Sequence, residues 1–230
     1  MKEKLKLKNG NILYIFQDEY PESPREWDNL GTMICFHRRY SLGDDKESKK
    51  YQGTEELFSE LAGCNADDEE FEGKEDKEVW QIIKERAHKN AIILPLALYD
   101  HSGLTMWVGS KASSFDPGGW DSGQIGWIYV TREKLKQEAL ADKTDAEIET
   151  YLENEVKQYD QYLTGDVYGF KLVKEVTNTW VSKETGEERT ETEEEELDSC
   201  HGFYGSNHGE NGLYDHAGIK AEDILEEVTV

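Results

Sequence analysis

Residues 91–130 carry three strand-like segments in succession, and this run constrains the fold more than any other part of the chain. The apolar run "AIILPLALYD" is followed by apolar segments at 104–108 and 124–130, with Asp, Ser and Gly between them. Short apolar runs bounded by turn residues are typical of strands. We therefore expect 91–130 to form neighbouring antiparallel strands.

Further strands are expected around an Asn9-Gly10 turn, over 32–38, and in a hairpin with its turn at "KETGEER". Helical spacing and capping residues predict helices over 54–62, 77–90, 131–164 (in two pieces, capped by Thr131 and Thr144) and 221–228. Strands and helices are grouped rather than strictly alternating. This favours an α+β fold with a mostly antiparallel β-sheet, helices packed on it, and an acidic β-hairpin near the C-terminus. We interpret residues 1–230 as a single α+β domain with an acidic loop at 65–78 and the acidic hairpin at 171–198 as appendages.

The charge balance limits the classes of partner. Fifty acidic residues stand against 26 basic ones, a net charge of -24. Binding to phosphate backbones through bulk electrostatics needs clustered Lys and Arg, so direct nucleic-acid binding is not expected, and an anionic membrane surface would repel the chain. Three explanations of the acidity remain: the chain binds cations, it binds basic protein surfaces, or its charge serves solubility alone.

Cysteine content and hydropathy indicate the compartment. The three cysteines Cys35, Cys64 and Cys200 are an odd number without paired spacing, which favours a reducing environment over a disulfide framework. No apolar run approaches the roughly 18 residues of a membrane span. We expect a cytoplasmic protein, and the sequence leaves its oligomeric state open.

Two Asp-Ser-Gly stretches are candidates for catalysis. If their strands pair, Asp100, His101 and Asp121 meet at the strand ends, where they could bind a divalent metal or act as general acid and base. Asp28, His37 and Asp166 could assist. The alternative is that both stretches are turns, in which Asp and Ser bind their own backbone and Gly takes a positive φ. We favour turns, because no recognised catalytic motif accompanies them.

Two other groups of residues, one rich in histidine and one basic, are candidates for binding sites. His201, His208 and His216 in a glycine-rich segment suggest zinc, but their spacing matches no closed structural site, so we expect no metal and no cofactor. A basic island is formed by His37, Arg38 and Arg39. It could bind an anion or could neutralise the protein's own acidic loops. We favour neutralisation.

Two acidic stretches are the most distinctive part of the chain. Residues 67–76 contain seven acids against one Lys, and residues 184–198 contain nine against one Arg. Along a strand, alternate carboxylates stand roughly 6.5–7 Å apart, a scale broadly similar to that of phosphates along a DNA strand. The residues that we expect to contact a partner are Asp67, Asp68, Glu69, Glu70, Glu187, Glu188, Glu191, Glu193, Glu194, Glu195 and Glu196.

Five blocks together resemble an uncharacterised protein family of bacteriophages, plasmids and other bacterial mobile elements. They are "PREWDNLGTMICFHRRYSLGD", "ILPLALYDHSGLTM", "WDSGQIGWIYV", "EVKQYDQYLTGDVYGF" and "LDSCHGFYG". The resemblance implies a context, a mobile-element protein acting inside a bacterial host, and no catalytic residues. The acidic arm at 187–196 and His201, where a Trp is more usual, depart from the family's pattern.

These observations lead to two hypotheses. The first is a non-enzymatic, nucleic-acid-mimicking inhibitor of anti-restriction or anti-CRISPR type, which binds the basic surface of a host protein through an acidic face. The second is a metal-assisted hydrolase or nucleotide-processing enzyme that uses Asp100, His101 and Asp121.

Overall fold

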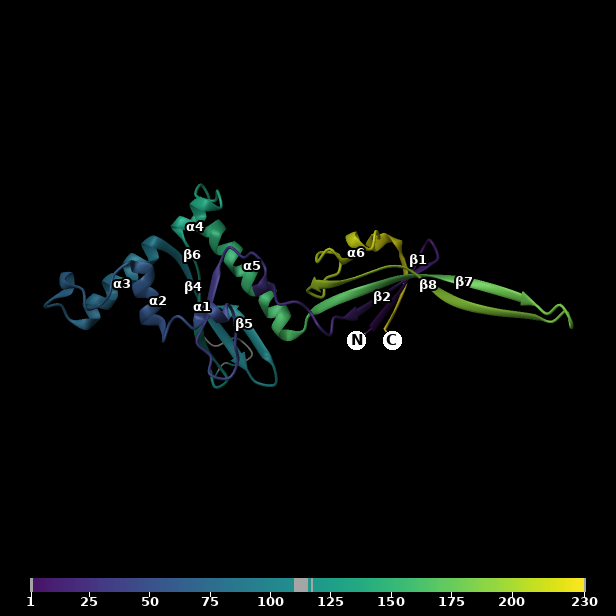
Figure 1. Ribbon diagram of the computed structural model, residues 1–230, viewed down its shortest axis with the longest axis horizontal. Coiled ribbons are helices and arrows are strands. Elements are labelled where there is room, and N and C mark those ends of the chain that lie inside the picture. The colour runs from purple at the N-terminus through teal and green to yellow at the C-terminus, as the bar shows by residue number, and fades with distance from the viewer. Residues whose placement is uncertain (1, 110–115, 117, 230) are drawn as a thin grey trace. The chain divides into compact units, whose positions relative to one another are not determined.

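The computed structural model describes residues 2–109, 116 and 118–229, and the chain groups into two compact units (Figure 1). The first unit joins Met1–Glu22 to Thr164–Val230, and the second is Ser23–Leu163. The sequence alone predicts one domain over residues 1–230, because neither connection between the two units has the composition of a linker. One connection lies in the short loop "PESP" and the other in the last turn of helix α5 (Asp145–Thr164).

The second unit is built around a four-stranded antiparallel sheet in the order β3-β6-β4-β5. Its strands are β3 (Thr32–Cys35), β4 (Ala91–Asp100), β5 (Leu104–Val108) and β6 (Ser122–Thr131). Its longer helices are α2 (Thr54–Ala62), α3 (Asp76–Asn90), α4 (Arg132–Gln137) and α5 (Asp145–Thr164), and its short ones are η1 (Pro24–Glu26), α1 (Asp45–Ser48) and η2 (Glu69–Phe71).

Helices cover both faces of this sheet. Met33 packs with α4 and α5, whereas the next residue, Ile34, packs with α2 and α3, and both side chains are fully buried. Successive side chains of a strand point to opposite faces, so the alternation in β3 divides the core into two layers.

The first unit contains a five-stranded antiparallel sheet in the order β8-β7-β2-β1-β9. Its strands are β1 (Lys2–Leu7), β2 (Asn11–Gln17), β7 (Val167–Val181), β8 (Glu188–Tyr204) and β9 (Ile224–Thr229). Short helices α6 (Leu213–His216) and η3 (Ala221–Asp223) precede β9. Leu213 and Ile219 pack on one face of the sheet against Leu5, Leu13 and Phe170.

The structure confirms the predicted α+β class and the acidic hairpin, which is formed by β7 and β8. It confirms both helix caps as well, since Thr131 Oγ1 accepts from Lys134 N–H and Thr144 Oγ1 accepts from Glu147 N–H. No described helix is long and apolar enough to cross a bilayer.

The helix predicted over 221–228 is wrong. Residues 224–229 form strand β9, which pairs antiparallel with β1 and places Lys6 Nζ 2.7 Å from Glu226 Oε2. Leu225, Glu226 and Glu227 are good helix formers, but pairing with the edge of β1 satisfies the backbone of both strands and overrides that weak preference.

The buried imidazole of His208 makes the first unit sensitive to pH. Its side chain is 7% exposed, Tyr168 lies edge-on against it with ring centroids 4.8 Å apart, and Glu3 Oε2 lies 3.8 Å from Nε2. Burial lowers the pKa of His208, and the charges of Glu3, Asp166 and Glu227 offset only part of this. The folded state therefore resists a proton that the unfolded chain accepts.

We predict that the first unit loses stability as the pH falls below about 6.5, the ordinary pKa of histidine. The loss attributable to His208 is limited to about 1.4 kcal/mol per pH unit, the value for one proton. His208→Asn should flatten the dependence of unfolding free energy on pH, measured by urea denaturation between pH 7.5 and 5. His201→Asn, at a side chain that is 58% exposed, is the control. Identical pH slopes in wild type and His208→Asn would contradict the assignment.

Candidate functional site

The ends of β4 and β6 meet at the two Asp-Ser-Gly stretches. Tyr99 pairs with Ser122, and Asp100 N–H donates to the Asp121 carbonyl at 2.9 Å. The side chains form two separate polar contacts: His101 Nδ1 lies 3.2 Å from Asp121 Oδ2, and the Asp100 carboxylate binds the guanidinium of Arg39. The backbone is thus arranged as the sequence indicated, and each carboxylate already has a partner within the protein.

His37 faces the same carboxylate but is not placed as a base. Its Nδ1 accepts the backbone N–H groups of Arg39 and Tyr40 at 3.3 and 3.2 Å, so the proton of the neutral ring lies on Nε2, 3.7 Å from Asp100 Oδ2. The ring stacks on Tyr40 at 5.3 Å. Because the basic nitrogen is engaged by the backbone, His37 serves to shape the 37–40 loop.

The serine of the second stretch is also engaged in local structure. The Ser122 hydroxyl donates to Asp116 at 2.7 Å, and Asp116 accepts the N–H groups of Trp120 and Asp121. The Ser122 hydroxyl lowers the pKa of Asp116, and these backbone bonds lower it further. Ser102 takes a φ of 58°, the left-handed conformation of a tight turn. The first stretch therefore has the geometry of a turn, as expected. The second does not, because Ser122 and Gly123 already belong to strand β6 and Gly123 does not take a positive φ.

A cavity of about 330 Å³ lies beside the basic island and is lined by Cys35, His37, Arg38, Arg39 and Lys49, among others. Burial raises the pKa of Cys35 to about 12, and the charge of Asp44 adds to this, so the thiol is neutral at pH 7 and is not activated as a nucleophile. Arg39 pairs with Asp100 and Lys49 with Asp45. These two cations neutralise local carboxylates.

Metal-binding chemistry finds no support in the described residues, where no group of three or more His, Cys, Asp or Glu side chains is placed to hold an ion. The three histidines of the glycine-rich segment have different surroundings. His201 packs against Phe16, His208 against Tyr168, and His216 against Phe203. Of the residues weighed as assistants in catalysis, Asp28 and His37 lie in the second unit and Asp166 in the first.

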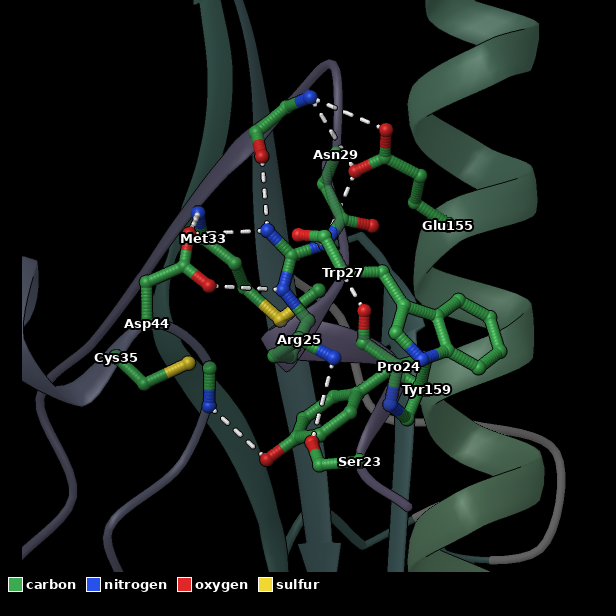
Figure 2. Close-up of polar contacts among 12 residues, drawn as sticks. Ser23, Pro24, Arg25, Trp27, Asn29, Met33, Cys35, Asp44, Glu155 and Tyr159 are labelled. Carbon is green, nitrogen blue, oxygen red and sulfur yellow. Dashed lines mark hydrogen bonds and ion pairs between the residues drawn. The ribbon is translucent and has the colours of Figure 1, made fainter.

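The second unit does contain a buried charge cluster, which the sequence did not reveal (Figure 2). The Arg25 side chain is 4% exposed. Its guanidinium donates to both oxygens of Asp44 at 2.9 Å, to Glu155 at 3.0 Å and to the Gly31 carbonyl at 2.8 Å. Burial alone lowers the pKa of Arg25, but the hydrogen bonds and charges of the two carboxylates outweigh it, and the net pKa is raised.

The two carboxylates of this cluster also bind backbone groups. Asp44 accepts from Met33 N–H at 2.8 Å, and Glu155 accepts from Leu30 N–H at 2.7 Å. The network thus joins the 24–31 loop, the start of β3 and helix α5. We assign it to the architecture of the second unit, since every group in it is engaged within the protein.

The acidic loop is tied to helix α3. Phe71 is buried and lies under the guanidinium of Arg86, which also binds Glu70 through two bonds of 2.5 and 2.7 Å. Arg86 lowers the pKa of Glu70. Asp68 accepts from Asn65 N–H at 2.8 Å. Of the four acids expected here to contact a partner, Asp67 and Glu69 are exposed and appear in no ion pair among the described residues.

The acidic hairpin extends beyond its sheet. Strand β2 pairs with β7 only as far as Lys174, so residues 175–181 pair with β8 alone. Every β8 side chain from 188 to 198 is exposed. Residues 174–181 and 188–196, which we call the acidic ribbon, therefore contribute almost nothing to a core.

The register places the glutamates of the acidic ribbon on two faces. Glu191, Glu193 and Glu195 stand opposite Asn178, Val176 and Lys174 on one face. The other face carries Thr190, Thr192, Glu194 and Glu196. The sequence prediction of alternate carboxylates along one face is thus confirmed.

Few cations neutralise these glutamates. Glu196 pairs with Lys171 at 3.0 Å, Arg189 approaches Glu191 at 4.0 Å, and Glu194 accepts from Tyr14 at 2.5 Å. Within the described part of the chain, Glu193 and Glu195 have no ion pair or side-chain hydrogen bond. The acidic ribbon lies in the first unit and the acidic loop in the second.

No family model, curated protein or solved structure matches the chain. The resemblance to a mobile-element family therefore stays a prediction.

We predict that Arg25→Met destabilises the second unit by about 3–5 kcal/mol, because two partly buried carboxylates lose their counter-charge. Arg132 provides the matched control. It binds Asp145 through bonds of 2.5 and 2.6 Å in an exposed setting, and Arg132→Met should cost about 1 kcal/mol or less. Chemical denaturation measures both. Equal losses in the two variants would show that burial of Arg25 does not govern the stability of this unit.

Proposed function

We propose that this chain is an accessory protein of a bacterial mobile element that binds, through its acidic ribbon, the basic surface of a host protein that handles nucleic acid. The observation that supports this most is the exposure of β8 from 188 to 198, where side chains contribute to no core. Segments that stabilise the fold bury apolar surface, and this one does not. Its carboxylates are exposed, and Lys171, Arg189 and Tyr14 engage only some of them.

The charge pattern favours a partner that binds nucleic acid. Residues 174–196 contain nine acidic and three basic side chains. Glu191, Glu193 and Glu195 stand on one face at alternate positions, and such residues are about 6.6–6.8 Å apart along a strand. A row of this kind presents negative charge at a repeat broadly similar to that of phosphates. The acidic ribbon would occupy the basic groove of a host protein and so block that groove to nucleic acid.

This mechanism is inhibition by electrostatic competition, of the anti-restriction or anti-CRISPR type, in the bacterial cytoplasm. The acidic loop supplies a second contact through Asp67, Asp68 and Glu69, while Glu70 is already engaged by Arg86. Interactions between exposed charges weaken as salt screens them, so binding should fall steeply with ionic strength.

We predict that replacing Glu191, Glu193, Glu194 and Glu195 by Gln abolishes capture of nucleic-acid-binding proteins from a bacterial lysate. The immobilised chain is offered lysate proteins that bind heparin, at low and at high salt. Wild type should retain a defined set of them at low salt and release it at high salt, because the contact is mainly electrostatic. Both chains are first checked for equal oligomeric state by sedimentation.

The control removes four charges elsewhere by replacing Glu138, Glu149, Glu153 and Glu210 with Gln, all of which are exposed. It has the same net charge as the ribbon variant, so it separates the place of the charges from their number. If the ribbon variant retains the same proteins as wild type, or if the control loses them equally, the proposal is wrong.

A further inference from the structure

Among the described residues, no strand pairs with the outer edge of β8. β8 stands at the end of the strand order β8-β7-β2-β1-β9, and in the described chain it pairs with β7 alone. Regular one-to-one pairing runs from Glu188 to Glu196, where the register shifts. An edge of this kind is a template to which another extended chain can add as a strand.

The turn of the hairpin sets which residues face that edge. Ser182 N–H donates to the Glu187 carbonyl at 2.9 Å, and Gly186, with a φ of 71°, donates to the Ser182 carbonyl. Hydrogen-bonded and non-bonded pairs alternate along an antiparallel ladder. Odd-numbered residues of β8 therefore bond to β7, and even-numbered residues from 188 to 196 direct their N–H and C=O groups outward.

The close contact of two threonines agrees with this assignment of outward-facing, even-numbered residues. Thr177 and Thr192 are opposite each other, with their hydroxyl oxygens 3.3 Å apart. Side chains approach most closely at non-hydrogen-bonded pairs. Thr192 thus belongs to the outward-facing set.

The charges of β8 determine what can occupy its edge. A second copy of β8 would bring glutamates beside glutamates, and like charges directly opposite each other destabilise a strand pair. An added strand with Lys or Arg at every second position has the same two-residue repeat as β8. Each of its cations can then lie beside Glu191, Glu193 or Glu195, with the alternate side chains over Thr190 and Thr192.

We infer that the edge of β8 from Glu188 to Glu196 takes up an extended basic segment of the partner protein as an added strand. Lys or Arg of that segment lie on the face of Glu191, Glu193 and Glu195, and β-branched residues lie on the opposite face. This inference rests on the proposed function and specifies the form in which the partner presents its positive charge. Backbone pairing would add to the electrostatic attraction and fix the register of the complex.

The test uses the full chain and a synthetic peptide of alternating Lys and Val, about as long as Glu188–Glu196. Its control is the same peptide with N-methyl groups on three consecutive central residues, which keeps every charge but removes backbone donors. The unmodified peptide should bind about ten-fold more tightly, the effect of losing one or two backbone hydrogen bonds. Amide hydrogen exchange should slow at Thr190, Thr192 and Glu194, and change little at Glu191 and Glu193.

The outcomes separate this inference from the proposed function. Equal binding of both peptides, lost when Glu191, Glu193, Glu194 and Glu195 become Gln, overturns strand addition and leaves the acidic ribbon as an electrostatic binding surface. Tighter binding of the unmodified peptide without slower exchange at the even-numbered residues also overturns it. If neither peptide binds, strand addition is wrong and the acidic ribbon is not a general receptor for basic chains.

Discussion

The guanidinium of Arg25 holds together three parts of the second unit that are distant in sequence. Asp44 lies 19 residues away and Glu155 lies 130 residues away, yet both bind the same buried side chain. Removing a charge from water is costly unless it is paired and hydrogen-bonded. The cluster meets this condition, because its carboxylates also accept backbone N–H groups at Leu30 and Met33.

The acidic ribbon differs from the second unit, because most of its carboxylates are not paired with an arginine among the described residues. In the second unit, Glu70, Asp100 and Asp145 each bind an arginine. In the ribbon, Glu175 and Glu194 stand directly opposite each other on the same two strands. Like charges in that position destabilise a pair of strands, and an isolated two-stranded hairpin is only marginally stable. The ribbon is therefore not explained by the stability of the fold, and this supports the proposal that it binds a partner.

Sequence patterns predicted most local elements, because alternation, capping and turn residues act over a few positions. Thr131 and Thr144 cap helices as expected, and the strands of 91–130 pair as expected. The final strand was missed because its pairing with β1 joins the two ends of the chain. The Arg25 cluster was missed for the same reason, since nothing near Arg25 in the sequence indicates Asp44 or Glu155. The backbones of Asp100 and Asp121 meet at the strand ends as expected, but the binding of the Asp100 carboxylate by Arg39 could be seen only in three dimensions.

Our proposal requires that the acidic ribbon occupies the site where its partner binds nucleic acid. A competition experiment tests this requirement: a protein captured by the immobilised chain is challenged with increasing amounts of duplex or single-stranded DNA at constant ionic strength. Nucleic acid and the chain should exclude each other, so that one of the two DNAs releases the captured protein while no complex of all three forms. A stable complex containing the chain, the captured protein and DNA together would contradict it.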